Sequence, residues 1–285
     1  MAGNPRVWLV TGVSSGFGRE LARVLLERGE TVVGTVRKEG GRAGFEALAP
    51  GRAHARVLDV TDTRAIPPLV GDIVREFGRI DVLVNNAGYG LLGAVEELDD
   101  AQARGVIDTN YFGTLNMIRA VLPHFRSRRR GHIVNISSSA GFMGMPGVAL
   151  YCASKFAVTG LSEALAGELA PFSIRVTVVQ PGGFRTDFSG RSLSLPREFM
   201  PEYDDTPAAR VRGMKAYHGT QQGDPAKAAR VIIEAVDAEQ SPVHLVLGPD
   251  AVAMQRGHLA ELTEELEAWE ASSSSTDFDK EKVAS

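Results

Sequence analysis

Cysteine is almost absent from this chain, which has one, Cys152, in 285 residues. An intrachain disulfide is therefore excluded, and so is a zinc site built from several cysteines. The six histidines are scattered, and no two are spaced four apart, which would place both imidazoles on one helix face. We expect no metal site. The scarcity of cysteine fits a reducing compartment, and we expect a cytoplasmic protein.

The chain also lacks an excess of basic charge and any long hydrophobic run. Its formal net charge is −4 and its pI is about 5.9, so nothing draws it generally to nucleic acid or to an anionic membrane. The single basic cluster, between Arg126 and Arg130, is interpreted as a solvated turn. The first apolar run, Val7–Val10, is too short for a signal peptide or a membrane span. We expect no nucleic-acid partner and no membrane partner.

Short apolar runs alternate with segments of helical spacing along the chain. Such runs, with little polar alternation, are typical of strands buried on both faces of a parallel sheet. The sequence therefore predicts an α/β fold, with a Rossmann-like, doubly wound sheet of seven mainly parallel strands and helices on both faces. The predicted strands are Val7–Val10, Thr31–Val36, Ala53–Leu58, Asp81–Val84, His132–Ile136, Arg175–Val179 and His244–Leu247.

One domain is predicted over residues 1–270, because the composition supports one large core and no repeat or linker divides it. The proline-containing stretch at about 187–223 interrupts the strand and helix rhythm. It is too long for a plain connection, so we expect a substrate loop or lid that contains short helices. Residues 271–285 begin with a serine run and are expected to form a solvated, flexible tail.

A glycine-rich turn follows the first predicted strand and contains Gly12, Gly16 and Gly18. Glycines at this place let the backbone approach a diphosphate, and the N-terminus of the following helix favours negative charge. The alternative is that these glycines serve only tight turning and packing. At the end of the second strand the chain has Arg37 and Lys38 where NAD-binding proteins have a carboxylate. A guanidinium can bind a 2′-phosphate, so NADP(H) is preferred, with NAD(H) as the alternative cofactor. A plain surface pair is the competing interpretation of these two residues.

Four motifs occur in an order that resembles the short-chain dehydrogenase/reductase family, in its compact single-domain branch. The resemblance covers about Val7 to Val246. It rests on the turn Thr11–Gly18, on Asn85–Gly88, on the residues Asn110, Ser138, Tyr151 and Lys155, and on the segment Pro181–Thr186.

The resemblance implies an oxidoreductase that moves hydride between the nicotinamide and a carbonyl or secondary alcohol carbon. Tyr151 would transfer the proton and Ser138 would hydrogen-bond the substrate oxygen. Tyr151 and Lys155 are four residues apart in a helical segment, so they share one face, and the ammonium would lower the pKa of the phenol. Asn110 would hold a water. The implied cofactor-binding residues are Gly12, Ser14, Ser15, Gly16, Phe17, Gly18, Arg37, Asp59, Val60, Asn86, Ala87, Gly88, Tyr151, Lys155, Pro181, Gly182, Phe184 and Thr186.

Apolar side chains are frequent in the segments expected around the reacting carbonyl. If they face the pocket, the substrate is a hydrophobic ketone or alcohol; if they pack inward, they carry no such information. The candidate pocket residues are Phe142, Met143, Met145 and Phe188, with Leu193, Leu195, Phe199 and Met200 in the same segments.

Two other functions stay open at this point. One is a sugar-nucleotide epimerase or dehydratase of the extended branch, and the other is a catalytically silent NADP-binding sensor or scaffold on the same fold. The resemblance also implies a homodimer or homotetramer, with part of the interface on the helix that carries Lys155.

Overall fold

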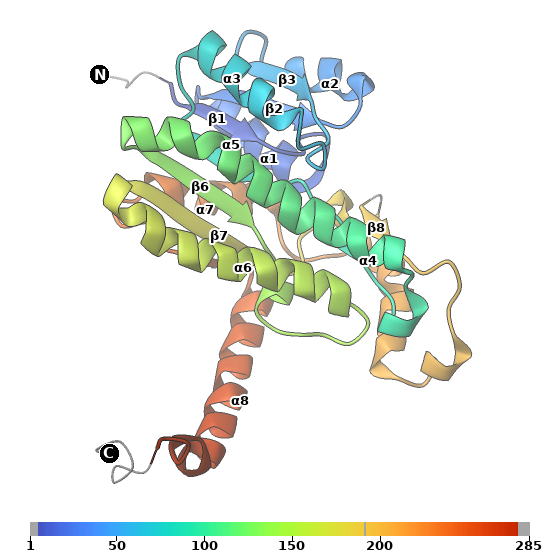
Figure 1. The fold of residues 1–285 in the computed structure, drawn as a ribbon. Coiled ribbons are helices and arrows are strands. Elements are labelled where there is room, and N and C mark those ends of the chain that lie inside the picture. Colours follow the sequence, from blue (N-terminus) through green and yellow to red (C-terminus); the bar gives the residue numbers. More distant parts are fainter. Residues whose placement is uncertain (1–4, 191, 279–285) are drawn as a thin grey trace.

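A parallel sheet of seven strands lies at the centre of the computed structural model, which describes residues 5–190 and 192–278 (Figure 1). The strand order is β3-β2-β1-β4-β6-β7-β9, and every neighbouring pair is parallel. This arrangement confirms the predicted doubly wound α/β fold. The strands are β1 (Val7–Val10), β2 (Thr31–Val36), β3 (Ala53–Val57), β4 (Val82–Asn85), β6 (Gly131–Ile136), β7 (Ile174–Pro181) and β9 (His244–Leu247).

The predicted and observed strands agree because the sheet interior selects buried apolar runs. All four residues of β1 are buried, as are all six of β6. Three predicted ranges match the structure, and the other four differ by one or two residues at an end. Strand ends fray, so differences of this size are expected.

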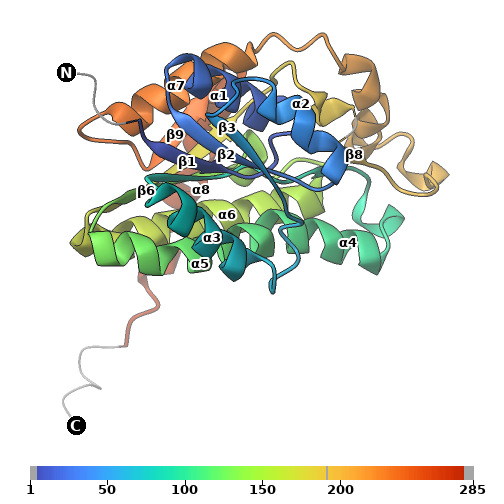
Figure 2. The same ribbon diagram turned by 90° about the horizontal axis from the view of Figure 1, so that it is seen from above.

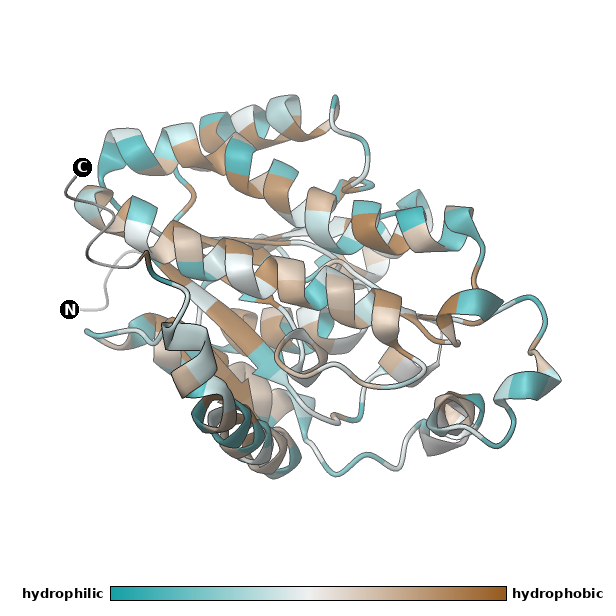
Figure 3. Cartoon of the chain, turned by 60° about the horizontal axis from the view of Figure 1, so that its bottom comes forward, coloured by the Kyte–Doolittle hydropathy of each residue, from teal (hydrophilic) through white to brown (hydrophobic). Residues whose placement is uncertain are grey.

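Helices cover both faces of the sheet (Figure 2). On one face α1 packs against α7, and on the other α3 packs against α5 with α6 beside them. Each layer has its own apolar core against the sheet, and hydrophobic and hydrophilic residues alternate around the covering helices (Figure 3). The helices are α1 (Gly16–Glu27), α2 (Arg42–Glu46), α3 (Ile66–Phe77), α4 (Asp100–Ile107), α5 (Gly113–Arg128), α6 (Ala149–Leu169), α7 (Pro225–Asp237) and α8 (Pro249–Ser274).

The stretch predicted as a lid contains short 3₁₀ helices, the longest at Pro207–Tyr217. It also contains a feature that the sequence did not predict. The two-residue strand β8 (Leu193–Ser194) pairs in parallel with β5 (Gly90–Leu91) and forms a second small sheet. The side chains of Leu193 and Phe188 come so close to Gly90 that a Cβ there would lie 2.9 and 2.8 Å from them. This part of the lid is therefore packed onto the body.

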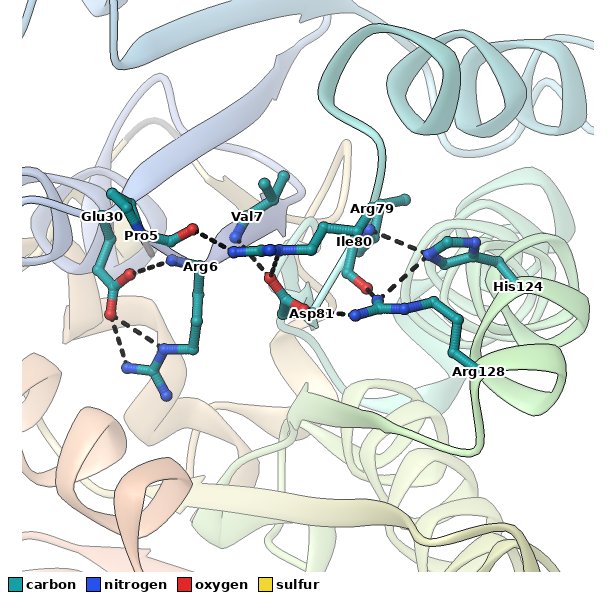
Figure 4. A network of polar contacts seen from close by, with 9 residues as sticks. All are labelled: Pro5, Arg6, Val7, Glu30, Arg79, Ile80, Asp81, His124 and Arg128. Atoms are coloured by element: carbon teal, nitrogen blue, oxygen red, sulfur yellow. Dashed lines mark hydrogen bonds and ion pairs between the residues drawn. The ribbon is translucent and has the colours of Figure 1, made fainter. Parts of the chain in front are cut away.

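Two expectations need correction: one concerns the C-terminal tail, and the other concerns the basic cluster between Arg126 and Arg130. Helix α8 continues to Ser274, so residues 271–274 of the predicted tail are helical, although all of them are exposed; residues 279–285 lie outside the described part. The basic cluster is not merely a solvated turn. Arg128, at the end of α5, donates to the carboxylate of Asp81 at 3.0 Å and to the Ile80 carbonyl (Figure 4).

Within residues 5–190 and 192–278, none of the helices has both the length and the apolar content that a bilayer crossing requires.

Candidate active site

A cavity of about 1380 Å³ opens at the carboxyl ends of the central strands. Side chains from the ends of β1, β2, β4, β6 and β7 line it, as does the start of α6. Ligands of open parallel sheets bind at this edge because the loops that leave the strands converge there. A pocket for one small ligand usually measures about 300–1,000 Å³. The cavity is thus large enough for a dinucleotide together with a substrate.

The glycine-rich turn forms one end of this cavity. Gly12 has φ of +73° and Gly16 has φ of +61°, a backbone region that other residues rarely adopt. At the N-terminus of α1, Ser15 makes no side-chain capping bond and the first helical turn has no acidic residue. The first amide groups of α1 are therefore free to bind an anion, and the helix dipole favours one. The residues of this turn fit the diphosphate of a dinucleotide.

Gly18, also predicted as a cofactor contact, has a packing role in the structure. It does not line the cavity, and a Cβ on it would lie 2.4 Å from Nδ2 of Asn86 and 2.5 Å from the Gly12 carbonyl oxygen. Asn86 uses this space to donate to the carbonyl groups of Thr11 and Gly12, at 2.9 and 3.0 Å. Gly18 thus lets Asn86 fix the turn in place.

The other predicted cofactor residues all line the cavity. Arg37 is exposed at the end of β2, next to the side of the cavity formed by the turn, and Asp59 and Val60 follow β3. Gly182 and Phe184 follow β7, and the ring of Phe184 lies 5.1 Å from that of Phe17 in the turn. The full set is Gly12, Ser14, Ser15, Gly16, Phe17, Arg37, Asp59, Val60, Asn86, Ala87, Gly88, Tyr151, Lys155, Pro181, Gly182, Phe184 and Thr186.

Tyr151, Lys155 and Ser138 meet on one wall of the same cavity. Tyr151 and Lys155 lie in the first two turns of α6, and Nζ of Lys155 is 5.8 Å from the centre of the tyrosine ring. The ammonium donates to the Ile136 carbonyl at 2.8 Å. Ser138 follows β6, and its hydroxyl accepts from the amide of Ala140 at 3.1 Å. A phenol, an ammonium and a hydroxyl thus converge where β6 and α6 meet.

Burial shifts both titratable groups of this wall toward their neutral forms. Burial raises the pKa of Tyr151, and a hydrogen bond with the Ser138 side chain opposes that shift. Burial also lowers the pKa of Lys155, to about 8. The sequence-based expectation was that Lys155 lowers the pKa of Tyr151. In this structure desolvation raises the pKa of Tyr151 instead, so the phenol is held in its protonated form.

Asn110 lies behind this wall, and its exposed fraction is 1%. It sits in the π-helical turn Asp108–Phe112, between α4 and α5. Its side chain accepts from the Tyr89 amide and donates to the Tyr89 carbonyl and to Oγ of Ser154, each at 3.0 Å. These bonds fix the segment after β4 against α6. The water-holding role implied for Asn110 stays a prediction.

The remaining wall of the cavity is apolar. Met143, Met145 and Phe188 line it as predicted, and the ring of Phe188 is 5.6 Å from that of Tyr151. Phe142, also predicted for the pocket, is not among the residues that line the cavity, and its ring lies 5.6 Å from the ring of His258 in α8. Of the neighbouring candidates Leu193 lines the cavity, whereas Leu195, Phe199 and Met200 do not.

Sequence reasoning missed several residues of the site. Asp250, in the first turn of α8, accepts from the Gly183 amide at 2.6 Å and so holds the loop after β7. A helix start marked by Pro249 directly after the last strand could have indicated it. The other residues had no local signal, because distant segments bring them together. They include Tyr89, Leu92, Val148, Val211, Met214 and Met254.

Comparison with known proteins places this arrangement in a family. The model of the short chain dehydrogenase family matches residues 6–194. A 3-ketodihydrosphingosine reductase of Bacteroides thetaiotaomicron is 40% identical over 86% of this chain and 88% of its own length. Retinol dehydrogenase 8 of Bos taurus is 37% identical over 85% of this chain and 81% of its own.

Solved structures agree with this result. A short-chain dehydrogenase from Streptomyces avermitilis superposes with a TM-score of 0.91 at 42% identity, over 97% of this chain and all of the other. Others, with TM-scores of 0.66 to 0.79 at 24–29% identity, cover 85–92% of this chain and contain NAD or NADP. The family model and these relatives show that this chain belongs to the short-chain dehydrogenase family.

Proposed function

We propose that this protein interconverts a hydrophobic ketone and its secondary alcohol with NADP(H), and that Tyr151 transfers the proton. One observation supports this above all. The phenol of Tyr151, with Ser138 and Lys155 beside it, lines the same cavity as the glycine-rich turn and Arg37. The groups needed for proton transfer and those suited to a dinucleotide therefore line one space.

The chain's own residues account for the handling of the proton. Because burial keeps Tyr151 protonated, the phenol can donate to a substrate oxygen as a carbonyl is reduced. Ser138 would hydrogen-bond the same oxygen and fix its position. Lys155 places a positive charge close to the phenol and would stabilise the phenolate that remains.

The cofactor would be held by the turn between Gly12 and Phe17, by the loop after β4 and by the segment after β7. When bound, it supplies or accepts the hydride. Arg37 would bind the 2′-phosphate of NADP, because a guanidinium can form two parallel hydrogen bonds with it. Asn110 and Asp250 would act as positioning residues, since each fixes a loop backbone and not a reacting group.

An apolar substrate is supported by the wall that holds Met143, Met145 and Phe188. The two named relatives point in the same direction. One is a reductase of 3-ketodihydrosphingosine and the other a dehydrogenase of retinol, and both of these molecules have long hydrocarbon portions. We infer a substrate whose reacting carbon carries an extended apolar group.

Turnover of a ketone panel tests the proposal. Purified protein would be mixed with NADPH and ketones of increasing chain length, and nicotinamide absorbance would be followed. Tyr151→Phe should lower kcat/KM by a factor of about 10²–10⁴, the usual contribution of a general acid. Tyr89→Phe, which alters a second phenol of the cavity, should leave most activity. If NADPH binds tightly while no ketone or alcohol is turned over, the protein is a sensor or scaffold instead.

Exchange of Arg37 tests the cofactor preference. Arg37→Asp removes the cation and adds a charge that repels a 2′-phosphate, so kcat/KM with NADPH should fall about 10- to 100-fold relative to NADH. Lys38→Asp is the matched control, because Lys38 is the adjacent cation and does not line the cavity. An unchanged NADPH to NADH ratio in the Arg37 variant would remove Arg37 from the phosphate site.

A further inference from the structure

Helix α8 leaves the body of the protein soon after it begins (Figure 1). Only Ala251, Met254, Gln255 and His258 are buried or half-buried, and they form a single face against the body. From Leu259 onward every residue of the helix is exposed. The part from Leu259 to Ser274 therefore extends about 24 Å into solvent.

An apolar stripe follows this projecting helix. Val252, Leu259, Leu262, Leu266 and Trp269 are separated by seven, three, four and three residues, which is the a and d spacing of a heptad repeat. Their exposed fractions are 38, 50, 45, 67 and 68%. Single apolar residues on a surface are ordinary, but apolar residues at each successive a and d position from Leu259 to Trp269 are typical of a helix that pairs with another helix.

The charges beside the stripe identify the partner. Every charged residue between Leu259 and Ser274 is a glutamate: Glu261, Glu264, Glu265, Glu267 and Glu270. Arg256, the arginine of α8, lies nearer the other end of the helix, beside the body, where Asp250 is the acidic residue. Parallel pairing of two copies would bring the acidic halves together, and like charges repel. Antiparallel pairing brings the acidic half of each copy close to Arg256 of the other.

Heptad geometry fixes the register of such a pair. If Leu262 packs on Leu266 of the second copy, then Leu259 meets Trp269 of that copy. In the same register Arg256 lies beside Glu270 of the second copy, while Thr263 and Glu265 each meet their own counterparts on the two sides of the two-fold axis. The apolar contacts and the charge pair thus agree on one arrangement.

We propose that α8 is an interaction surface that pairs antiparallel with α8 of a second copy of this chain, through Leu259, Leu262, Leu266 and Trp269. This interface is separate from the surface of α6 that the family resemblance implies. A membrane surface is the less favoured occupant, because membrane-bound amphipathic helices usually carry lysine and arginine on their polar face, whereas this one carries glutamate.

Sedimentation equilibrium tests the pairing. Leu262→Glu places a charge in the centre of the stripe, and it should halve the number of subunits per particle. Ala268→Glu adds the same charge on the opposite side of α8 and should leave the particle unchanged. Turnover by Leu262→Glu should equal that of the unmodified protein, which shows that it folds. An unmodified protein that stays monomeric at about 100 µM, or a particle that Leu262→Glu does not change, would overturn the proposal.

Charge exchange and cross-linking test the register. Arg256→Glu and Glu270→Arg should each weaken the assembly at least several-fold, and the double variant should restore it. Thr263→Cys should form a disulfide between copies under mild oxidation, whereas Glu264→Cys should not. The native Cys152 is 4% exposed and should not interfere. A double variant as weak as the single ones would rule out this antiparallel register.

Binding to lipid vesicles tests the alternative that the apolar stripe of α8 contacts a membrane. Trp269 is exposed, and the only other tryptophan, Trp8, is fully buried. A blue shift of tryptophan fluorescence with phosphatidylcholine vesicles, abolished by Leu262→Glu, would assign the stripe to a membrane and contradict the proposal. If vesicles leave the fluorescence unchanged and Leu262→Glu halves the number of subunits per particle, the results support the pair of helices. Neither result depends on which substrate the cavity binds.

Discussion

At the residue scale, Tyr151 differs most from what its sequence context indicates. The spacing to Lys155 predicts a phenol with a lowered pKa, but in the structure burial raises it. A neutral phenol is the form that reduction uses, because it can donate at once. The alcohol oxidation direction needs the phenolate and must first remove this proton. The two directions therefore depend differently on pH.

We expect this difference in kinetic profiles. Because the pKa of Tyr151 is raised, its phenolate fraction should grow about tenfold per pH unit above pH 7, and kcat/KM for alcohol oxidation should rise with it. The rise should become less steep near pH 8, where Lys155 loses its proton. kcat/KM for ketone reduction should be flat from pH 6 to 8. Lys155→Met should remove the change of slope. A flat oxidation profile between pH 7 and 9 would contradict the assignment of Tyr151 as the base.

At the element scale, the sheet, its helices and the place of the lid could be predicted, but the packing of the lid onto the body could not. Runs such as Val7–Val10 are buried in full, so their composition is dictated by the sheet. The pairing of β5 with β8 involves two residues on each strand, too few for a pattern. The cavity residues of the lid and of α8, such as Val211 and Met254, come from positions far along the chain. Only the folded topology brings them to the site.

The lid itself is anchored by one buried carboxylate. Glu97, whose side chain is 2% exposed, accepts from the Met200 amide at 3.0 Å and pairs with Arg212 at 3.1 Å. Arg212 also donates to the Met200 carbonyl and lies 4.7 Å from the centre of the Phe199 ring. These contacts join the 3₁₀ helix Pro207–Tyr217 to the body beside Val211, which lines the cavity.

Weakening this anchor should loosen substrate binding. Glu97→Gln removes the charge that Arg212 pairs with, and loss of a charged hydrogen bond costs about 1.5–3 kcal/mol. We expect KM for an apolar ketone to rise about tenfold with kcat changed less. Glu96→Gln is the control, since Glu96 contacts Tyr203 of the lid at the exposed surface. Equal effects from both variants would show that the buried pair is not the anchor.

At the scale of the whole molecule, the cavity and a polar network that stabilises the fold lie at opposite edges of the sheet. The cavity lies at the carboxyl ends of the strands, whereas a polar network lies at the amino ends (Figure 4). There Asp81 accepts from the Val7 amide at 2.9 Å, from Arg79 at 2.8 Å and from Arg128 at 3.0 Å. These bonds, which together outweigh the effect of burial, lower the pKa of Asp81. One carboxylate thus joins the start of β1, the approach to β4 and the end of α5.

Removing this carboxylate should lower stability and leave catalysis intact. Asp81→Ala removes the carboxylate that accepts from a buried amide and from two half-buried guanidinium groups, and we expect the free energy of unfolding to fall by about 2–4 kcal/mol. Denaturant unfolding would measure the loss, and kcat/KM at 25 °C should stay within twofold, because the site is formed at the other edge. Arg75→Ala breaks an exposed pair with Asp72 and should cost less than about 1 kcal/mol. A large fall in kcat/KM for Asp81→Ala, with unfolding unchanged, would mean that the two edges are coupled through the sheet and are not independent.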